Sequence, residues 1–340
     1  MDTAKLSTTL DTMASDTGFS GAVHVRQDKQ DLYQKAFGYA DRSNRIPNTL
    51  ATRFGIASGT KFFTALAVGK LIEAGKLDFS SKVAKLIPWD FRQYSREITV
   101  RQLLTHTSGI PDYYDEEKVE DFDNFTVGVP WYELKGPRDY LAVFPDEAMK
   151  FPPGERFSYS NGGYILLGVL IEEISGMPYR EFVEKEIFAP AGMHRSGYFA
   201  MNKLPEGTAF GYVQEENGWR TNIYNLPIIG ASDGGAYTTL HDIEKLWDMF
   251  WSYRILSKEM VGTYTAPHVK TTSENAGRFY GHGIWVRTGS DTEEYIVGED
   301  AGVSFYSGVT QAKDLLITVI SNTTEGAWPI LRAINEILQD

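Results

Sequence analysis

The stretch RFGIASGTKFFTALAVGKLIEAG, residues 53–75, places a serine at the start of a strongly helical run. Ser58 is the only serine in the chain that has a lysine, Lys61, three residues later. Apolar side chains then recur with helical spacing, and Gly75 is a suitable end for the helix. Ser58 and Lys61 are one turn apart, so we expect their side chains on the same face of this helix.

The Ser58/Lys61 pair has the chemistry of an activated nucleophile. The start of a helix has unpaired backbone N–H groups, and these groups and the helix dipole favour negative charge. If the Lys61 amine is partly desolvated, its pKa falls and the amine can remove the proton from the Ser58 hydroxyl. The alternative interpretation is structural, because serine is a common N-cap and lysine a common surface residue.

A second candidate is Tyr159-Ser160-Asn161, the only Tyr-x-Asn in the chain. It follows the turn-rich segment FPPGERF at 151–157 and precedes a helix that we expect from residue 163. A tyrosine close to a lysine ammonium is pushed towards phenolate, which is a usable general base. Asn161 can hydrogen-bond the lysine and orient it, although an asparagine near a helix start is often only a cap.

The order of sequence blocks along the chain is more specific than either motif. The blocks are SGTK at 58–61, LLTHTSGIPD at 103–112, PGERFSYSNGGYILLG at 153–168 and IFAPAGM at 187–193. In this order they resemble the serine β-lactamase/penicillin-binding-protein superfamily, in its class C β-lactamase-like branch. That branch includes esterases, D-aminopeptidases and D-alanyl-D-alanine carboxypeptidases. The similarity extends from about residue 21 to the C-terminal strands.

The resemblance implies a mechanism. Ser58 attacks a carbonyl, Lys61 and Tyr159 relay the proton, Asn161 positions Lys61, and water hydrolyses the acyl-enzyme. Which of Lys61 and Tyr159 is the base remains open at this point. No cofactor is expected. The predicted function is hydrolysis of an ester or amide by a serine hydrolase of esterase, carboxypeptidase or aminopeptidase type. The alternative is a non-catalytic relative that binds a ligand or partner in the same cleft.

The third motif of the resembled family, a Lys or His followed by a small residue and Gly, is incomplete in YIVGEDAGVSF at 295–305. The alignment puts Ile296 at the cation, Gly298 at the glycine and the Glu299 N–H at the second oxyanion donor. Without the cation, and beside Glu299 and Asp300, an anionic β-lactam or peptide carboxylate would bind poorly. We therefore favour neutral esters, or amides bearing an amine, over β-lactams. Alternatively, Glu299 and Asp300 only shape a solvated turn.

Other candidates are weaker. GASDG at 230–234 fits the Gly-x-Ser-x-Gly pattern, but no helix follows directly, so Ser232 is not expected to be catalytic. Tyr113 lies in an aromatic segment that would either line a substrate cleft or serve only for packing. His282 is a candidate to replace the missing cation, and His106 is expected to bind backbone near the site. No histidine has metal-ligand spacing, so no metal site is expected.

Composition excludes several classes of protein. The formal net charge of −12 argues against nucleic acid as a partner, because phosphate binding needs a basic surface. The chain has no cysteine, which excludes thiol catalysis and disulfides. It shows neither a signal peptide nor the ~18 consecutive apolar residues of a membrane span. We expect a cytoplasmic protein as the sequence is written, although an exported protein without its signal would look the same. The expected partner is a small-molecule or peptide-like substrate, and the oligomeric state is left open.

Strand patterns lie at both ends of the chain and helical patterns in the middle, which predicts an α+β, β-lactamase/transpeptidase-like fold. The two ends should share one antiparallel sheet in a single unit, 1–340, with a sheet subdomain at about 1–55 plus 275–340 and a helical region at about 56–274. We expect an exposed loop at 112–123. The expected strands are 21–25, 32–38, 281–287, 293–297, 303–309 and 315–321, and the expected helices include 163–174, 179–188, 240–251 and about 328–338.

Overall fold

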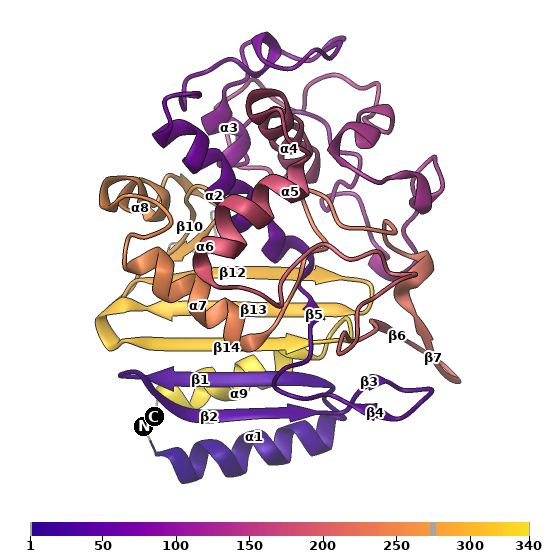
Figure 1. The fold of residues 1–340 in the computed structure, drawn as a ribbon, viewed down its shortest axis with the longest axis vertical. Helices are drawn as coiled ribbons and strands as arrows, with labels where there is room; N and C mark the ends of the chain where they lie inside the picture. The colour runs from indigo at the N-terminus through magenta and orange to yellow at the C-terminus, as the bar shows by residue number, and fades with distance from the viewer. Residues whose placement is uncertain (1, 273–276, 340) are drawn as a thin grey trace.

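A computed structural model describes residues 2–272 and 277–339. Its centre is an eight-stranded antiparallel sheet with the order β2-β1-β14-β13-β12-β11-β10-β9 (Figure 1). Both ends of the chain contribute strands to it, as predicted. The strands are β1 (Gly21–Gln27), β2 (Gln30–Phe37), β9 (Val269–Lys270), β10 (Arg278–Tyr280), β11 (Trp285–Arg287), β12 (Glu293–Asp300), β13 (Val303–Thr310) and β14 (Leu315–Ser321).

The pairing of β1 with β14 joins the two ends of the chain. The register runs from Gly21 opposite Ser321 to Gln27 opposite Leu315, so the whole of β1 lies against the whole of β14. On its other edge β1 pairs with β2. Every residue of β14 is buried, as expected for a strand covered on both faces.

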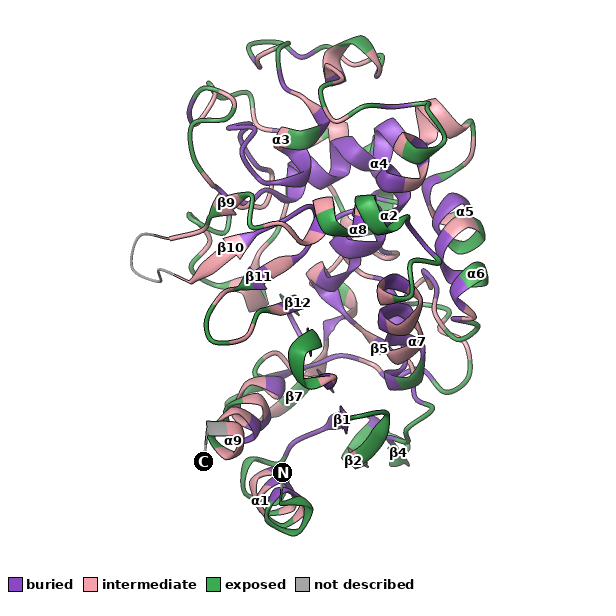
Figure 2. Ribbon diagram, turned by 90° about the vertical axis from the view of Figure 1, so that its left-hand side faces the viewer, coloured by how far each residue is buried: buried purple, intermediate pink, exposed green. Residues whose placement is uncertain are grey.

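Two terminal helices cover one face of the sheet. These helices, α1 (Thr3–Thr17) and α9 (Ala327–Gln339), pack against each other and against the sheet (Figures 1 and 2). Their inward side chains include Leu6, Leu10, Ile330 and Ile334, each at most 1% exposed. Amphipathic spacing at both ends of the chain thus forms a small core of its own.

The helical region covers the other face. Its two central helices are α2 (Thr60–Glu73) and α4 (Asn161–Ser175), which are in contact and are buried on most sides (Figure 2). In α2 every residue of the range 60–69 is buried. A helix that is apolar on all sides belongs in the interior of a large domain, so the start of α2 lies deep in the molecule.

The remaining elements are shorter. Of these, α7 occupies the predicted range 240–251. They are α3 (Val100–Leu104), α5 (Tyr179–Val183), α6 (Ala189–Ala191), α7 (Leu240–Trp251), α8 (Lys258–Thr265), β3 (Tyr39–Asp41), β4 (Ile46–Pro47), β5 (Phe54–Gly55), β6 (Tyr212–Glu215), β7 (Gly218–Thr221) and β8 (Tyr237–Thr238).

Several predicted boundaries were wrong. The expected helix 179–188 is helical over this range, but it consists of α5 followed by a π-helical turn, Glu184–Phe188. In the expected strand 281–287 only β11 is extended, because the chain turns at Gly283, where φ is 77°. The loop 112–123 is not exposed throughout, since Asp112 and Asp115 are at most 7% exposed.

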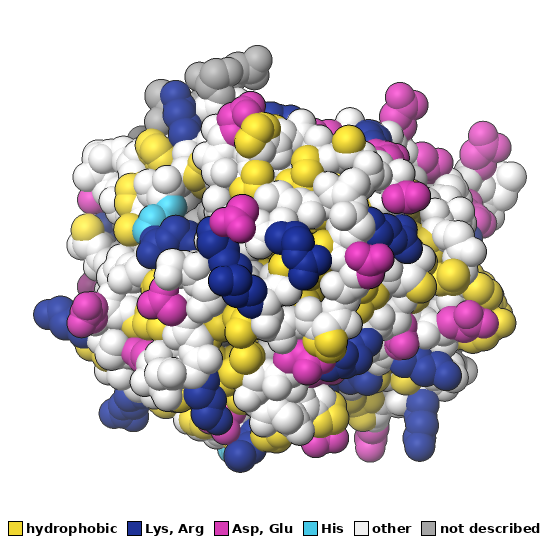
Figure 3. Space-filling view, turned by 90° about the horizontal axis from the view of Figure 1, so that it is seen from above, with side chains coloured by type: hydrophobic (Ala, Val, Ile, Leu, Met, Phe, Trp, Pro, Cys, Tyr) yellow, Lys and Arg dark blue, Asp and Glu magenta, His cyan; other side chains and the backbone are white. Residues whose placement is uncertain are grey.

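The surface carries charges of both signs. On the face shown in Figure 3, Lys and Arg side chains are interspersed with Asp and Glu. This face therefore offers no continuous basic patch for a nucleic acid. None of the helices in the described parts of the chain has the length and apolar character needed to cross a bilayer.

Candidate active site

The nucleophile candidate, Ser58, lies between the start of a helix and an edge of the sheet. It belongs to a 3-10 turn, η1 (Ala57–Gly59), that leads into α2 and packs against β12. A Cβ atom at Gly298 of β12 would lie 2.2 Å from the Ile56 carbonyl oxygen and 2.8 Å from the Ser58 backbone nitrogen. Only glycine permits this approach, which explains in steric terms why the third motif has a glycine at this position.

The edge of β12 beside Ser58 is not paired with another strand. The short strand β11 pairs with Glu293, Glu294 and Tyr295. The range 296–300 pairs with β13 only, on the other side. The backbone groups of this edge are therefore available to a ligand that lies next to Ser58.

Lys61 is 1% exposed, and its amine is surrounded by three oxygen atoms. Nζ lies 2.8 Å from Ser58 Oγ, 2.7 Å from Asn161 Oδ1 and 2.7 Å from the Asp233 carbonyl oxygen. Burial lowers the pKa of Lys61, and the nearby carboxylates, Asp233 first, oppose this decrease. The predicted contacts with Ser58 and Asn161 are both present.

Tyr159 lies beside the amine but presents its ring to it. Lys61 Nζ is 4.9 Å from the ring centroid, and the ring packs against His106 and Trp285. Burial, with a smaller contribution from Glu116, raises the pKa of Tyr159 well above its usual value. The free site therefore favours a neutral phenol and not the phenolate considered from the sequence.

The N-terminus of α4 is fixed by side chains from the 103–112 block. Asp112 accepts hydrogen bonds from the backbone N–H groups of Asn161 and Gly162, the latter at 2.9 Å. His106 Nδ1 accepts from the Ser160 N–H at 3.0 Å, which agrees with its expected structural role. Burial raises the pKa of Asp112 to about 7, although these N–H groups oppose the increase. The block thus positions Asn161, and through it Lys61.

The 230–234 segment contributes backbone and not a nucleophile. Ser232 is fully buried, and a Cβ at Gly168 would lie 2.1 Å from its Oγ, so this hydroxyl faces the body of α4. Its neighbour Asp233 accepts a hydrogen bond from the Tyr113 hydroxyl through its side chain. The loop reaches Lys61 through the Asp233 carbonyl oxygen.

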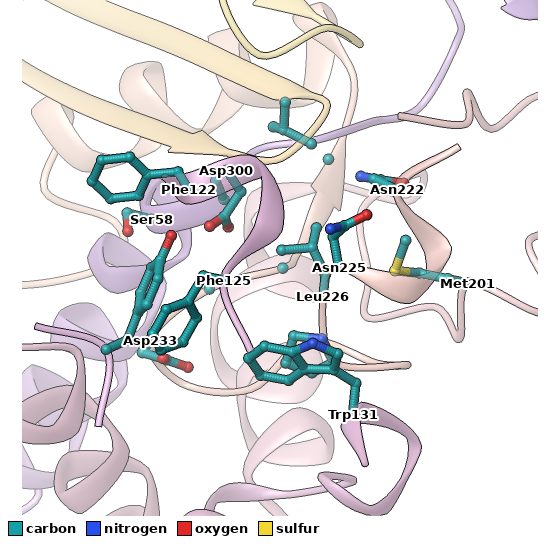
Figure 4. A pocket seen from close by; sticks show the side chains of 18 of the residues that line it. Ser58, Phe122, Phe125, Trp131, Met201, Asn222, Asn225, Leu226, Asp233 and Asp300 are labelled. Carbon is teal, nitrogen blue, oxygen red and sulfur yellow. The ribbon is translucent and has the colours of Figure 1, made fainter. Parts of the chain in front are cut away.

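A pocket opens next to Ser58 (Figure 4). One wall is aromatic, the carboxylates of Asp233 and Asp300 face the cavity, and the far part is lined by polar and apolar side chains. No Lys, Arg or His is among the described residues that line it. The aromatic residues of the lining are Tyr113, Tyr114, Phe122, Phe125, Trp131, Tyr140, Phe199 and Tyr237.

The two acidic residues after Gly298 lie in different surroundings. Asp300 lines the pocket, whereas Glu299 is exposed and accepts a hydrogen bond from Trp328 Nε1 of α9 at 2.8 Å. The expected acidic pair is therefore a single pocket carboxylate, because successive strand residues face opposite sides. At the position of the missing cation, Ile296 is 2% exposed and belongs to the core.

Comparison with known proteins agrees with this architecture. Residues 7–338 match the Beta-lactamase family. The chain belongs to that family. It is 30% identical to "Penicillin-binding protein 4*" of Bacillus subtilis (strain 168), over 98% of this chain and 75% of that protein. The crystal structure of a penicillin binding protein from Bacillus halodurans is 40% identical, with a TM-score of 0.90 and coverage of 96% and 99%. The octameric penicillin-binding protein homologue from Pyrococcus abyssi is 30% identical, with a TM-score of 0.86 and coverage of 100% and 78%.

His282, the candidate to replace the third-motif cation, does not lie in the pocket of this Beta-lactamase family member. It is fully buried outside the pocket lining, where its ring stacks on Phe79 at 4.7 Å and lies 4.1 Å from the ring of His268. Burial lowers the pKa of His282 to about 2, so it carries no charge. The prediction about His282 was wrong because the chain turns at Gly283, so residue 282 lies outside the part of the expected strand that forms, β11.

A group of possible metal ligands lies elsewhere in this family member. Among the described residues, His24, Asp31 and Glu244 place ligand atoms within 4.8 Å of one another. However, Arg26 Nη1 is 2.5 Å from Glu244, and His24 Nε2 is 2.7 Å from Asp31. A guanidinium already supplies the positive charge, so we assign this group to an ion-pair network.

The sequence did not single out Asp233 or Asp112 as site residues. Asp233 lies in the 230–234 segment, which was considered only for a serine nucleophile, and its contribution to Lys61 is a backbone carbonyl, which any residue type provides. Asp112 was part of a segment expected to be exposed. The position of Asp112 in the 103–112 block, which carries part of the family resemblance, was the feature that could have identified it as a site residue.

Proposed function

We propose that the protein is a serine hydrolase that cleaves an ester or amide bond through an acyl-enzyme on Ser58. The observation that carries the proposal is the contact of 2.8 Å between Lys61 Nζ and Ser58 Oγ at a buried amine. A serine next to a desolvated amine at a helix start is an activated nucleophile.

Lys61 is the proposed base for acylation. An ammonium would donate to all three oxygen neighbours. A neutral amine keeps two hydrogens for the carbonyl oxygens of Asn161 and Asp233 and turns its lone pair towards Ser58 Oγ, which lets it accept the hydroxyl proton. The lowered pKa of Lys61 favours this neutral form.

Tyr159 is the proposed proton donor to the leaving group. Its raised pKa supports a neutral hydroxyl, and the ring lies next to both Lys61 and Ser58. The proton that Lys61 takes from Ser58 would be returned through this hydroxyl as the bond to the leaving group breaks. In deacylation the proton transfers would run in reverse: Tyr159 and Lys61 would take a proton from the attacking water and return one to Ser58 Oγ.

Two backbone N–H groups are proposed to stabilise the oxyanion. One belongs to Ser58 and the other to Glu299, on the edge of β12 that has no strand partner on this side. Support comes from the close approach that Gly298 permits between this edge and Ser58.

The proposed preference is for neutral or cationic substrates over anionic ones. Ile296 takes the place of a cation, and Asp300 adds a carboxyl group to the pocket. A substrate carboxylate would meet no positive charge there except Lys61, which is occupied by its three oxygen neighbours. We therefore expect esterase or peptidase activity to exceed β-lactam hydrolysis.

The test is intact-mass spectrometry after incubation with p-nitrophenyl acetate, benzylpenicillin and a fluorophosphonate. We expect an adduct that Ser58→Ala abolishes and that the matched control Ser232→Ala retains, with turnover of the ester and little of the penicillin. Rapid turnover of benzylpenicillin would contradict the substrate preference alone.

A non-catalytic binding protein is the second candidate, and the observation that favours it is the missing third-motif cation at Ile296. That candidate predicts no Ser58 adduct with any of the three reagents. If no adduct forms, the binding-protein candidate replaces the hydrolase proposal.

A further inference from the structure

We propose that the pocket beside Ser58 contains an ammonium subsite, formed by the Asp300 carboxylate and the rings of Tyr114 and Phe122, so that preferred acyl donors carry a free amine close to the reacting carbonyl. The inference rests on the proposed function of Ser58. It names the substrate class of that site and the residue that selects it.

The first observation is the position of Asp300. It is the last residue of β12, two positions after Gly298, and its side chain faces the cavity that also contains Ser58 (Figure 4). Within the described parts of the chain, no hydrogen-bond donor or ion-pair partner contacts its carboxylate. A desolvated carboxyl group without a partner is costly unless a ligand supplies one.

The second observation is the aromatic wall. The ring of Tyr114 lies 5.9 Å from Phe122 and 4.5 Å from Phe125, and all three rings line the pocket. Phe122 and Asp300 line the same pocket as Ser58 (Figure 4). Aromatic faces beside a carboxylate attract an alkylammonium group through cation–π contacts and a charged hydrogen bond.

The third observation is the charge balance. Among the largest influences on Asp300, Lys61 contributes positive charge, whereas Asp233, Glu116 and Glu299 all add negative charge around it. Burial and these neighbours raise the pKa of Asp300 to about 8. A bound ammonium would relieve this repulsion, and a bound carboxylate would increase it.

The experiment compares matched p-nitroanilides that differ only at the carbon next to the reacting carbonyl. The 3-phenylpropionyl compound is neutral, the D- and L-phenylalanyl compounds carry an ammonium, and the N-succinyl-phenylalanyl compounds carry a carboxylate. We expect kcat/KM to be highest for a phenylalanyl compound. Neutral donors that react as well as amine donors would overturn the subsite.

The variants are Asp300→Asn and its matched control Glu325→Gln, which removes an exposed carboxyl group that does not line the pocket. Asp300→Asn should lower kcat/KM about 30-fold for the amine donor and change it less than about threefold for the neutral donor. Glu325→Gln should leave the ratio of the two unchanged. Equal effects of the two variants on that ratio would contradict the proposal.

A binding measurement separates this proposal from the hydrolase proposal. Titration of Ser58→Ala with 2-phenylethylamine should show binding that Asp300→Asn abolishes, and 2-phenylethanol should bind much more weakly. If the amine binds in this way but Ser58 forms no adduct, the subsite stands and the hydrolase fails. If Ser58 forms an adduct but the amine and the alcohol bind alike, the hydrolase stands and the subsite fails.

Discussion

At the residue scale the proposed chemistry depends on one buried amine. Lys61 has three oxygen neighbours and no water-exposed surface of note, so its proton affinity is set by the protein alone. Lys61→Met keeps the length of the side chain and removes the base. We expect the rate of Ser58 acylation to fall about 10³-fold.

The measurement is stopped-flow acylation by p-nitrophenyl acetate. Lys70→Met is the control, because Lys70 lies on the same helix and donates only to the Ile255 carbonyl oxygen, at 3.3 Å. This control should acylate at the wild-type rate. An equal loss in both variants would mean that the effect is structural and that Lys61 is not the base.

The raised pKa of Asp300 makes the stability of the fold depend on pH. Its carboxyl group has a folded-state pKa of about 8, against 3.8 for the unperturbed group. The folded state therefore binds this proton more tightly than the unfolded chain, and the free energy of unfolding decreases as pH rises from about 4 to about 8. Asp300→Asn removes the cost of ionisation, so it should raise the Tm by about 2 °C at pH 9 and by less at pH 5.

Thermal unfolding at both pH values checks the sign. Asp11→Asn provides the opposite case, because hydrogen bonds from Tyr33 and Lys35 lower the pKa of Asp11. Its ionised form stabilises the fold above about pH 4, so this variant should lower the Tm at pH 9. A lower Tm for Asp300→Asn at pH 9 would show that its carboxylate has a stabilising partner.

At the element scale the contact between η1 and β12 aligns the site. A Cβ at Gly298 would lie 2.2 Å from the Ile56 carbonyl oxygen, so Gly298→Ala must separate the strand from Ser58. We expect a loss of about 2 kcal/mol in stability and a fall of about 100-fold in kcat/KM. Gly289→Ala, where a Cβ would meet only the Asp291 carbonyl oxygen at 3.8 Å, should change neither. Urea unfolding and ester hydrolysis measure the two quantities.

Elements with a strong pattern were predictable from the sequence. The amphipathic helix at 240–251 and the apolar strand at 315–321 have the expected bounds. The helix buries side chains that recur with helical spacing, and the strand is a continuous apolar run that is buried along its whole length. The two-residue and three-residue strands β9 and β10 were not expected, since two or three residues cannot show an alternation.

Within the site, local spacing predicted the contact of Lys61 with Ser58, and the family resemblance implied its contact with Asn161. It could not separate Glu299 from Asp300. Their opposite directions depend on β12 continuing to residue 300, whereas the expected strand ended at 297. Asp233 was missed as well, because it enters the site through tertiary packing and a backbone carbonyl.

At the scale of the whole molecule, the two ends of the chain form one structural unit. The helices α1 and α9 pack together, β1 pairs along its full length with β14, and the N- and C-termini lie near each other (Figure 1). The site lies on the far side of this sheet, at the start of α2. The fold should therefore depend on the contact between the N-terminal and C-terminal elements and not on the order in which these elements follow one another along the chain.

A circular permutant tests this. The ends are joined by a short Gly/Ser linker and the chain is opened at the exposed hairpin tip between Glu216 and Asn217. We expect a Tm within about 5 °C of the wild type and retained labelling of Ser58, because no strand of the main sheet is interrupted. Deletion of residues 1–27 provides the contrast, since it removes β1 and leaves the edge of β14 unpaired. That variant should be insoluble, and a folded, labelled product from it would show that the C-terminal strands and the helical region form the site without the N-terminal strands.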